Sequence, residues 1–233
     1  TGALRPEDLK PVDSLHLGGW QATEALLAQL DIAPGAQALD IGCGIGGTVR
    51  ELAVQHGADA WGVDLTPEFV AAAETLSRMA GVTGVSFAQG SAVALPFPAE
   101  RFDLATLLHV GMNVPDKAAM FAEAARVLRP GGVFAIYDVM RVGEGALGFP
   151  MPWAGTAAIS FVEAPDIYAE LGRAAGFRET ARRERAALGI AFLEALQGRG
   201  PARAAMPEDR LANALDALRG GVLAPVELIL RRN

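Results

Sequence analysis

A glycine-rich turn between two carboxylates is the part of this sequence whose residue types and spacing could do chemistry. A short apolar run that contains Asp40 leads into residues 42–47, where four of the six positions are glycine. Such a turn can adopt left-handed backbone conformations and approach a ligand closely. The helix that follows would direct its first N–H groups toward the same place. Because Asp40 would repel a pyrophosphate, we expect a ligand that carries positive charge or hydrogen-bond donors.

The same turn also fits the fingerprint of dinucleotide-binding proteins. Gly42, Gly44 and Gly47 have the GxGxxG spacing, and Asp64 follows about twenty positions later. A carboxylate there can bind the ribose diol of any nucleoside through two charge-assisted hydrogen bonds. Asp40 and the lack of a segment typical of a nicotinamide pocket count against a NAD-dependent oxidoreductase, which stays open as an alternative.

Alternating strand and helix patterns must position these residues. Strands are expected at 38–40, 60–63, 85–88, 102–108 and 133–139, with helices at about 46–55 and 67–79 and a further helix capped by Asp116. Thr66 is the expected N-cap of the helix at 67–79. Units of this length predict an α/β fold with a doubly wound parallel sheet. Ligands bind such sheets at the carboxyl ends of the strands, where His109 and Asp138 are also expected.

Segments on either side of this core complete the organisation. Residues 1–33 are expected to form an N-terminal helical cap, with a short helix at 4–9 broken at Pro11 and another at about 21–30. Residues 34–233 then form one Rossmann-like domain. This domain contains a lid insertion at about 140–160 and a helical insertion at about 187–220, with strands at 178–184 and 226–230.

Composition narrows the function classes. The 233 residues are 51% hydrophobic, with a net charge of −7 and a pI near 5.0, which suits one substantial core and disfavours a general nucleic-acid binder. Cys43 is the only cysteine, so a reducing cytoplasm is expected. No apolar run approaches membrane-spanning length, and no signal pattern is seen, so we expect no membrane partner.

Four segments of the chain resemble the motifs of class I S-adenosylmethionine-dependent methyltransferases. The resemblance covers about residues 34–140 in order and spacing. It is closest to the small-molecule branch that includes sarcosine/dimethylglycine and ubiquinone-type methyltransferases. The segments are 39–46 (LDIGCGIG), 62–65 (GVDL), 90–103 (GSAVALPFPAERFD) and 126–132 (RVLRPGG).

The resemblance implies a Rossmann-like sheet of seven strands in the order 3-2-1-4-5-7-6, with the last strand antiparallel. It also implies S-adenosylmethionine as cofactor, which is phosphate-free and carries a sulfonium cation. Asp40 would accept from the methionine ammonium, the glycine N–H groups would bind the carboxylate, and Asp64 would bind the ribose. The full set of expected cofactor contacts is Asp40, Gly42, Cys43, Gly44, Asp64, Leu65, Ser91, Ala92 and His109.

On this interpretation the chain is an enzyme that transfers a methyl group to a small molecule by in-line displacement. His109 and His16 are candidate bases, although His16 is equally well a structural contact in the cap. Trp20, Trp153 and Asp138 are candidate substrate contacts, and no metal is expected. The alternatives are an enzyme of the same fold that catalyses a cyclisation or rearrangement, the NAD-dependent oxidoreductase, and a non-catalytic partner subunit. Either a monomer or a homodimer is compatible with the sequence.

Overall fold

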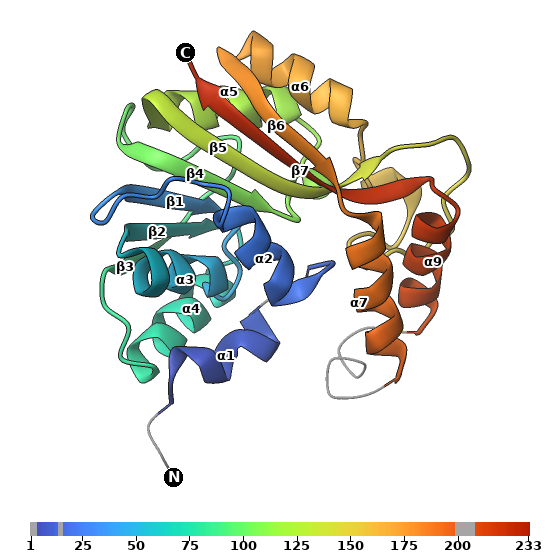
Figure 1. Cartoon of the computed structure of the whole chain (residues 1–233), viewed down its shortest axis with the longest axis horizontal. Helices are drawn as coiled ribbons and strands as arrows, with labels where there is room; N and C mark the ends of the chain where they lie inside the picture. The colour runs from blue at the N-terminus through green and yellow to red at the C-terminus, as the bar shows by residue number, and fades with distance from the viewer. Residues whose placement is uncertain (1–3, 14–15, 199–207) are drawn as a thin grey trace.

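A seven-stranded sheet in the order β3-β2-β1-β4-β5-β7-β6 forms the centre of the protein (Figure 1). The computed structural model describes residues 4–13, 16–198 and 208–233. The strands β1 to β5 are parallel, and β7 pairs antiparallel with both β5 and β6. The expected α/β fold, strand order and antiparallel last strand are therefore confirmed. The strands are β1 (Gln37–Ile41), β2 (Asp59–Asp64), β3 (Val85–Gln89), β4 (Phe102–Leu108), β5 (Leu128–Arg141), β6 (Phe177–Glu184) and β7 (Leu223–Arg232).

Helices cover both faces of this sheet. Apolar side chains of α2 and α3 pack on one face, and those of α5 and α6 pack on the other. Successive side chains of a strand point to opposite faces of the sheet, so neighbouring residues of β5 contact different sets of helices. The helices are α1 (Pro6–Asp13), α2 (Gly19–Leu27), α3 (Gly47–His56), α4 (Pro67–Met79), α5 (Lys117–Val127), α6 (Pro165–Ala174), α7 (Ala186–Gly198) and α9 (Glu208–Arg219), with short 3-10 turns at Gly111–Asn113 and Ala157–Ile159.

A second core lies beside the main one. The helices α7 and α9 run side by side and project from the end of the sheet (Figure 1). Between them and the 140–160 segment lies an apolar cluster that includes Met151, Leu193 and Leu215, and Leu17 from the N-terminal region joins it. The lid role expected for the 140–160 segment stays a prediction, but its packing partner is this pair of helices.

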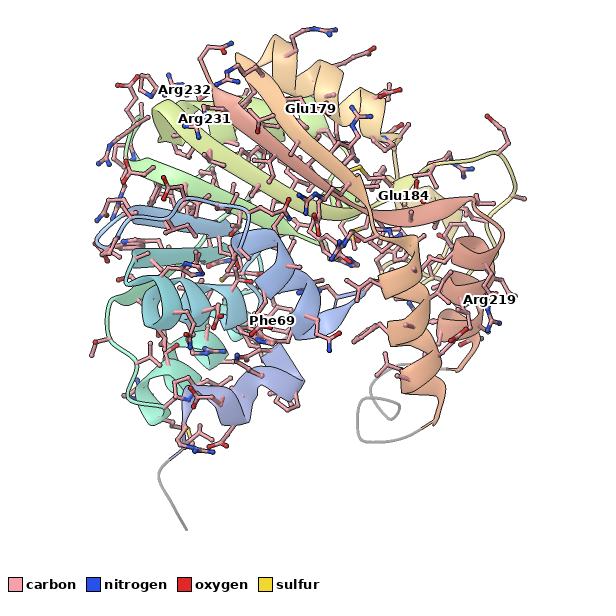
Figure 2. The ribbon with its side chains drawn as sticks, in the orientation of Figure 1. Phe69, Glu179, Glu184, Arg219, Arg231 and Arg232 are labelled. Atoms are coloured by element: carbon pink, nitrogen blue, oxygen red, sulfur yellow. The ribbon has the colours of Figure 1, made fainter. Side chains whose placement is uncertain are left out.

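The far edge of the sheet is charged. The outer strand β6 exposes Glu179 and Glu184, and Arg231 lies close by on β7 (Figure 2). Charged side chains on an edge strand discourage pairing with another chain. In the part of the chain that the structure describes, no helix is both long and apolar enough to cross a membrane.

Three local expectations need correction. α1 continues through Pro11, because this proline comes two residues before the helix ends and removes only one intrahelical bond. β5 begins at Leu128, since this residue already pairs with Phe102 and the register shifts before Val133 pairs with Leu104. Thr66 stands before α4 as expected, but its side chain makes no cap bond.

The expected cap of α5 is confirmed, as Asp116 accepts from the Ala119 N–H at 2.9 Å.

Candidate functional site

One cavity of about 750 Å³ opens at the carboxyl ends of β1, β2 and β4. This volume falls in the range of about 300–1,000 Å³ that small-molecule sites occupy. The glycine turn, the end of β2 and residues 90–93 line one part, which we call the turn half. The other part, the cap half, is lined by residues 16–17, 112–116 and 152–153 and by the inner side of α7. Segments far apart in the sequence thus enclose a single space.

The N–H groups of the glycine turn are engaged within the protein. Gly42 and Cys43 both donate to the carbonyl of Val63, at 2.7 and 3.0 Å. The Gly44 N–H donates to the Asp64 carboxylate at 2.9 Å. Contrary to expectation, the N–H groups of Gly42 and Gly44 therefore do not stand free to bind a ligand anion. The turn is built to hold Asp64.

Two glycines of the turn have different reasons to be glycine. Gly42 has a φ of +76°, and a Cβ there would lie 2.2 Å from a methyl carbon of Val110. Gly44 has a φ of +52°, but a Cβ there would meet no protein atom within 4 Å. Gly42 is thus required by packing, whereas Gly44 borders open space in the cavity.

Asp40 is a buried carboxyl group at the floor of the turn half. Its side chain is 3% exposed, and the Thr106 hydroxyl donates to one carboxylate oxygen at 2.7 Å. Among the described residues no other group donates to Asp40. Burial raises the pKa of Asp40 to about 7, although the Thr106 hydrogen bond opposes this rise. A cationic group of a ligand would supply the missing partner.

Asp64 ends β2 with both carboxylate oxygens in use. One accepts from Gly44 and the other from the Thr66 N–H, each at 2.9 Å. Leu65 follows with 69% of its surface exposed, and Phe69 on α4, labelled in Figure 2, is 48% exposed. Both apolar side chains line the cavity. A carboxylate flanked by exposed apolar side chains suits a ligand that combines hydroxyl groups with a flat ring.

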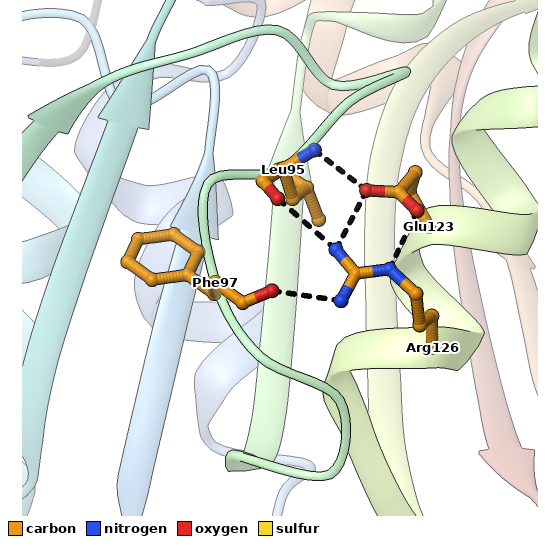
Figure 3. A network of polar contacts seen from close by, with 4 residues as sticks. All are labelled: Leu95, Phe97, Glu123 and Arg126. Atoms are coloured by element: carbon orange, nitrogen blue, oxygen red, sulfur yellow. Dashed lines mark hydrogen bonds and ion pairs between the residues drawn. The ribbon is translucent and has the colours of Figure 1, made fainter.

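A polar network fixes the segment that carries Ser91 and Ala92 (Figure 3). Arg126 donates to both oxygens of Glu123, at 2.7 and 2.8 Å, and to the carbonyls of Phe97 and Leu95, at 2.7 and 3.0 Å. Glu123 in turn accepts from the Leu95 N–H at 2.6 Å. The hydrogen bond from Arg126 holds the pKa of Glu123 below its usual value. This network ties the loop after β3 to α5.

His16 and His109 meet at the boundary between the two halves. His109 follows β4 with a φ of +56°, and its N–H donates to the Tyr137 carbonyl at 2.7 Å. The two imidazole rings are 5.5 Å apart between centroids, and His16 Nε2 lies 2.9 Å from the Thr23 hydroxyl. Burial lowers the pKa of His16 to about 4 and the pKa of His109 well below its usual value. Both rings are therefore neutral at pH 7.

Two of the three residues expected to contact the substrate, Trp20 and Asp138, do not line the cavity. Trp20 sits where α2 meets α1 and α3, with the Lys10 ammonium 3.9 Å from its ring centroid. Asp138 is fully buried behind the cavity, where the Tyr168 hydroxyl donates to it at 2.6 Å. Trp153 does line the cavity, and its indole N–H donates to Ser160 at 3.0 Å.

Several residues of the site were not predicted from the sequence. Thr106, which binds Asp40 but does not line the cavity, had a signal, since it is a polar side chain in the otherwise apolar centre of β4. Met112, Phe192 and Leu193 had none, because apolar residues in a loop or helix do not reveal which surface they face.

Comparison with known proteins adds an independent line of evidence. A family model described as a methyltransferase domain matches residues 39–136. A 2-methyl-6-phytyl-1,4-hydroquinone methyltransferase of Synechocystis is 39% identical over 128 residues, which are 54% of this chain and 38% of that protein. Methyltransferase GfsG of Streptomyces halstedii is 34% identical over 134 residues, 57% of this chain and 48% of the relative. The chain thus matches less than half the length of either relative.

Solved structures agree in fold. A geranyl diphosphate C-methyltransferase of Streptomyces coelicolor has a TM-score of 0.75 at 17% identity, covering 91% of this chain and 79% of that one. Phosphoethanolamine N-methyltransferase 2 of Haemonchus contortus has a TM-score of 0.77 at 20% identity, covering 95% and 54%. The cyclase SpnF has a TM-score of 0.73 at 22% identity, covering 91% and 80%. At these identities the likeness concerns the fold alone.

Proposed function

Because residues 39–136 form a class I S-adenosylmethionine-dependent methyltransferase domain, we propose that the protein transfers a methyl group from this cofactor to a small-molecule acceptor. The observation that carries the proposal is the pairing of a buried Asp40 with a glycine turn in which the N–H groups of Gly42, Cys43 and Gly44 are already engaged. This arrangement offers an acceptor to a cation.

The residues of the turn half fit this cofactor. Asp40 faces the place where an ammonium group can satisfy it, and no lysine or arginine among the described residues lines the cavity to bind a pyrophosphate. Asp64 would accept from the ribose hydroxyls, since each carboxylate oxygen keeps a further lone pair. Leu65, Ser91 and Ala92 would border the adenine ring. Gly42, Gly44 and His109 would complete the contacts.

Cys43 contributes shape rather than chemistry. Its thiol is buried, and a Cβ on the neighbouring Gly62 would lie only 2.7 Å from the sulfur. Burial raises the pKa of this thiol, so it is not a nucleophile at pH 7.

The proposed reaction needs positioning and the removal of a proton. S-adenosylmethionine supplies a methyl group on a sulfonium centre, whose C–S bond electrons stay on sulfur when the acceptor's lone pair forms the new bond. The cavity would hold the two partners in line. His109 or His16 would take the acceptor's proton, since both rings line the cavity and are neutral.

Two alternatives have less support. A cyclisation or rearrangement in the same fold is compatible with the likeness to SpnF, but that likeness concerns only the fold. A NAD-dependent oxidoreductase is disfavoured by the engaged turn and by the lack of a lining cation in the described residues.

Titration calorimetry tests the proposal. S-adenosylmethionine and S-adenosylhomocysteine should bind in the micromolar range, while NADH should not. Failure of both adenosyl compounds to bind would overturn it. A cytoplasmic location and a monomeric or homodimeric state remain predictions.

A further inference from the structure

The loop that follows β4 is held in a strained conformation. It comprises residues 109–114, all of which except Gly111 line the cavity. His109 has a left-handed φ of +56°, which is uncommon for a residue with a side chain. Such strain persists only where the surrounding contacts fix the backbone. The contacts that fix this loop therefore determine where His109 lies.

The end of β5 supplies the first of these contacts. β4 ends at Leu108, whereas β5 continues past its partner Tyr137 and runs beside the loop. The Tyr137 carbonyl accepts from the His109 N–H at 2.7 Å. The next side chain, Asp138, points to the opposite face of the sheet, where it accepts from the Tyr168 hydroxyl at 2.6 Å. We call Asp138 and Tyr168 the buried pair, because both side chains are fully buried.

Gly111, in the middle of the loop, lies directly against the buried pair. A Cβ at this position would be only 2.3 Å from Oδ2 of Asp138 and 2.4 Å from the hydroxyl oxygen of Tyr168. The φ of Gly111 is not left-handed, so the close approach alone requires glycine here. Neither member of the buried pair is among the described residues that line the cavity. The pair therefore contacts the loop from behind.

Hydrogen bonds fix the far end of the same loop. Lys117 is 5% exposed, and its ammonium group donates to the carbonyls of Val114, at 3.0 Å, and Phe161. The Phe161 N–H donates to the Met112 carbonyl at 2.8 Å. With both ends of the loop bonded in this way, the contact with the buried pair fixes its middle.

We propose that Asp138 and Tyr168 are positioning residues, which hold the loop at 109–114 so that His109 lies at the boundary between the turn half and the cap half. The role rests on the proposed function, in which His109 is a candidate base. Val110 of the same loop lies against Gly42 of the glycine turn. A shift of the loop should therefore change both the place of the imidazole and the affinity for the cofactor.

Histidine NMR signals test this role without any acceptor. The chain has three histidines, so protein with isotope-labelled histidine gives three imidazole Cε1–Hε1 signals, which are assigned by replacing each histidine in turn with glutamine. The ring of His109 lies 5.5 Å from the rings of both His16 and Tyr137, between centroids. Because aromatic rings shift the signals of nearby nuclei, a small displacement of His109 changes its signal.

Tyr168→Phe removes only the hydroxyl group of the buried pair. In this variant the His109 signal should shift, while the signal of His56, at the end of α3, should stay in place. Amide exchange should accelerate in residues 110–113. S-adenosylhomocysteine should bind about fivefold more weakly in calorimetry, an effect of the size expected for a residue that touches no ligand.

Two further variants make the result specific. Gly111→Ala disturbs the same contact from the side of the loop and should also shift the His109 signal. Phe177→Leu, in the same hydrophobic core but at the start of β6, is the matched control. It should lower the stability to urea without moving this signal.

The outcomes separate the positioning role from the proposed function. An unmoved His109 signal in Tyr168→Phe would overturn the positioning role. An equal shift in Phe177→Leu would also overturn it, because the signal would then report lost stability alone. Failure of S-adenosylhomocysteine to bind the wild type would count against the proposed function, while the NMR signals, which need no ligand, would still decide the role of the buried pair.

Discussion

His16 and His109 lie 5.5 Å apart between ring centroids, although one comes from the N-terminal region and the other from the end of β4. Tyr137 completes the group, with its ring 5.8 Å from His16 and 5.5 Å from His109. The tyrosine hydroxyl is buried, and burial raises its pKa above the usual value. Three neutral rings therefore pack together at the boundary between the turn half and the cap half, and none of them carries a fixed charge at pH 7.

Cofactor binding is expected to release a proton. At pH 7 the raised pKa leaves Asp40 about half protonated, and an ammonium group beside it favours the ionised form. Binding of S-adenosylhomocysteine should then release up to about half a proton per site. Calorimetry in phosphate and Tris buffers measures this number from the difference in apparent enthalpy. Methylthioadenosine, which lacks the amino acid, should release none, and Asp40→Asn should abolish the effect. The same release with methylthioadenosine would contradict the assignment of Asp40.

Asp64→Asn should weaken binding of S-adenosylhomocysteine by about tenfold to a hundredfold, since hydrogen bonds to a charged group contribute about 1.5–3 kcal/mol. Part of the loss comes from the Gly44 N–H, which would face a weaker or mismatched acceptor. Asp59→Asn at the start of the same strand is the control, because Asp59 is exposed and bonds only to Gln37 among the described side chains. Equal affinities of the two variants in calorimetry would rule out a cofactor role for Asp64.

The two glycines should respond differently to alanine. Gly42→Ala should lower the free energy of unfolding by about 3 kcal/mol, because it combines a left-handed backbone with a clash against Val110. Gly44→Ala should cost only about 1–2 kcal/mol but weaken cofactor binding, since its methyl group enters open space in the cavity. Urea unfolding and calorimetry separate the two effects. Val110→Ala should partly rescue Gly42→Ala; if it does not, the clash is not the cause.

Arg126→Ala should loosen the loop that carries Ser91 and Ala92. The variant removes the guanidinium that binds Glu123 and the carbonyls of Leu95 and Phe97 (Figure 3), at a cost of about 2 kcal/mol. Amide hydrogen exchange should accelerate in residues 91–95, and cofactor affinity should fall severalfold. Arg129→Ala removes a half-exposed ion pair with Asp103 and should cost less than about 1 kcal/mol. Unchanged exchange in Arg126→Ala would show that the network does not hold this loop.

Acid should destabilise the fold through the buried histidines. The folded-state pKa of His16, about 4, lies below its usual value of 6.5, so the stability is complete above pH 6.5 and declines as the pH falls toward 4. Because the raised pKa of Asp40 favours the folded state as the pH falls, the histidine contribution is measured as a difference between variants. Between pH 7 and pH 5 in urea unfolding, the change in stability should be about 1–2 kcal/mol less favourable for the wild type than for His16→Gln. His56→Gln, at the end of α3 and less buried, should have a smaller effect. An equal decline in His16→Gln and wild type would refute the role of His16.

The sequence was enough to predict those site residues whose place depends only on their position in a strand. Asp40, Asp64 and His109 stand at or near the ends of parallel strands, and the topology alone brings them to one edge. The prediction failed for Asp138 because β5 continues past it to Arg141, so its side chain turns to the opposite face from Tyr137 and into the buried contact with Tyr168.

Residues of the cap half could not be predicted in the same way. Trp20 lies on a helix whose buried side carries Ala22, Thr23 and Leu26, and its own position depends on contact with α1. Phe192 and Leu193 reach the cavity only because α7 and α9 pack together and project over the end of the sheet. Such placement results from long-range packing, which local patterns do not encode.

The separate core of α7, α9 and the 140–160 segment has a consequence for how this protein can diversify. On the proposed function, substitutions inside that cluster would reshape the acceptor pocket, while the glycine turn, Asp40 and Asp64 would keep their own contacts with β1, β2 and β4. The molecule is in this sense modular. Selection, or an engineer grafting a new pair of helices, could then change the proposed acceptor without rebuilding the residues proposed to bind the methyl donor.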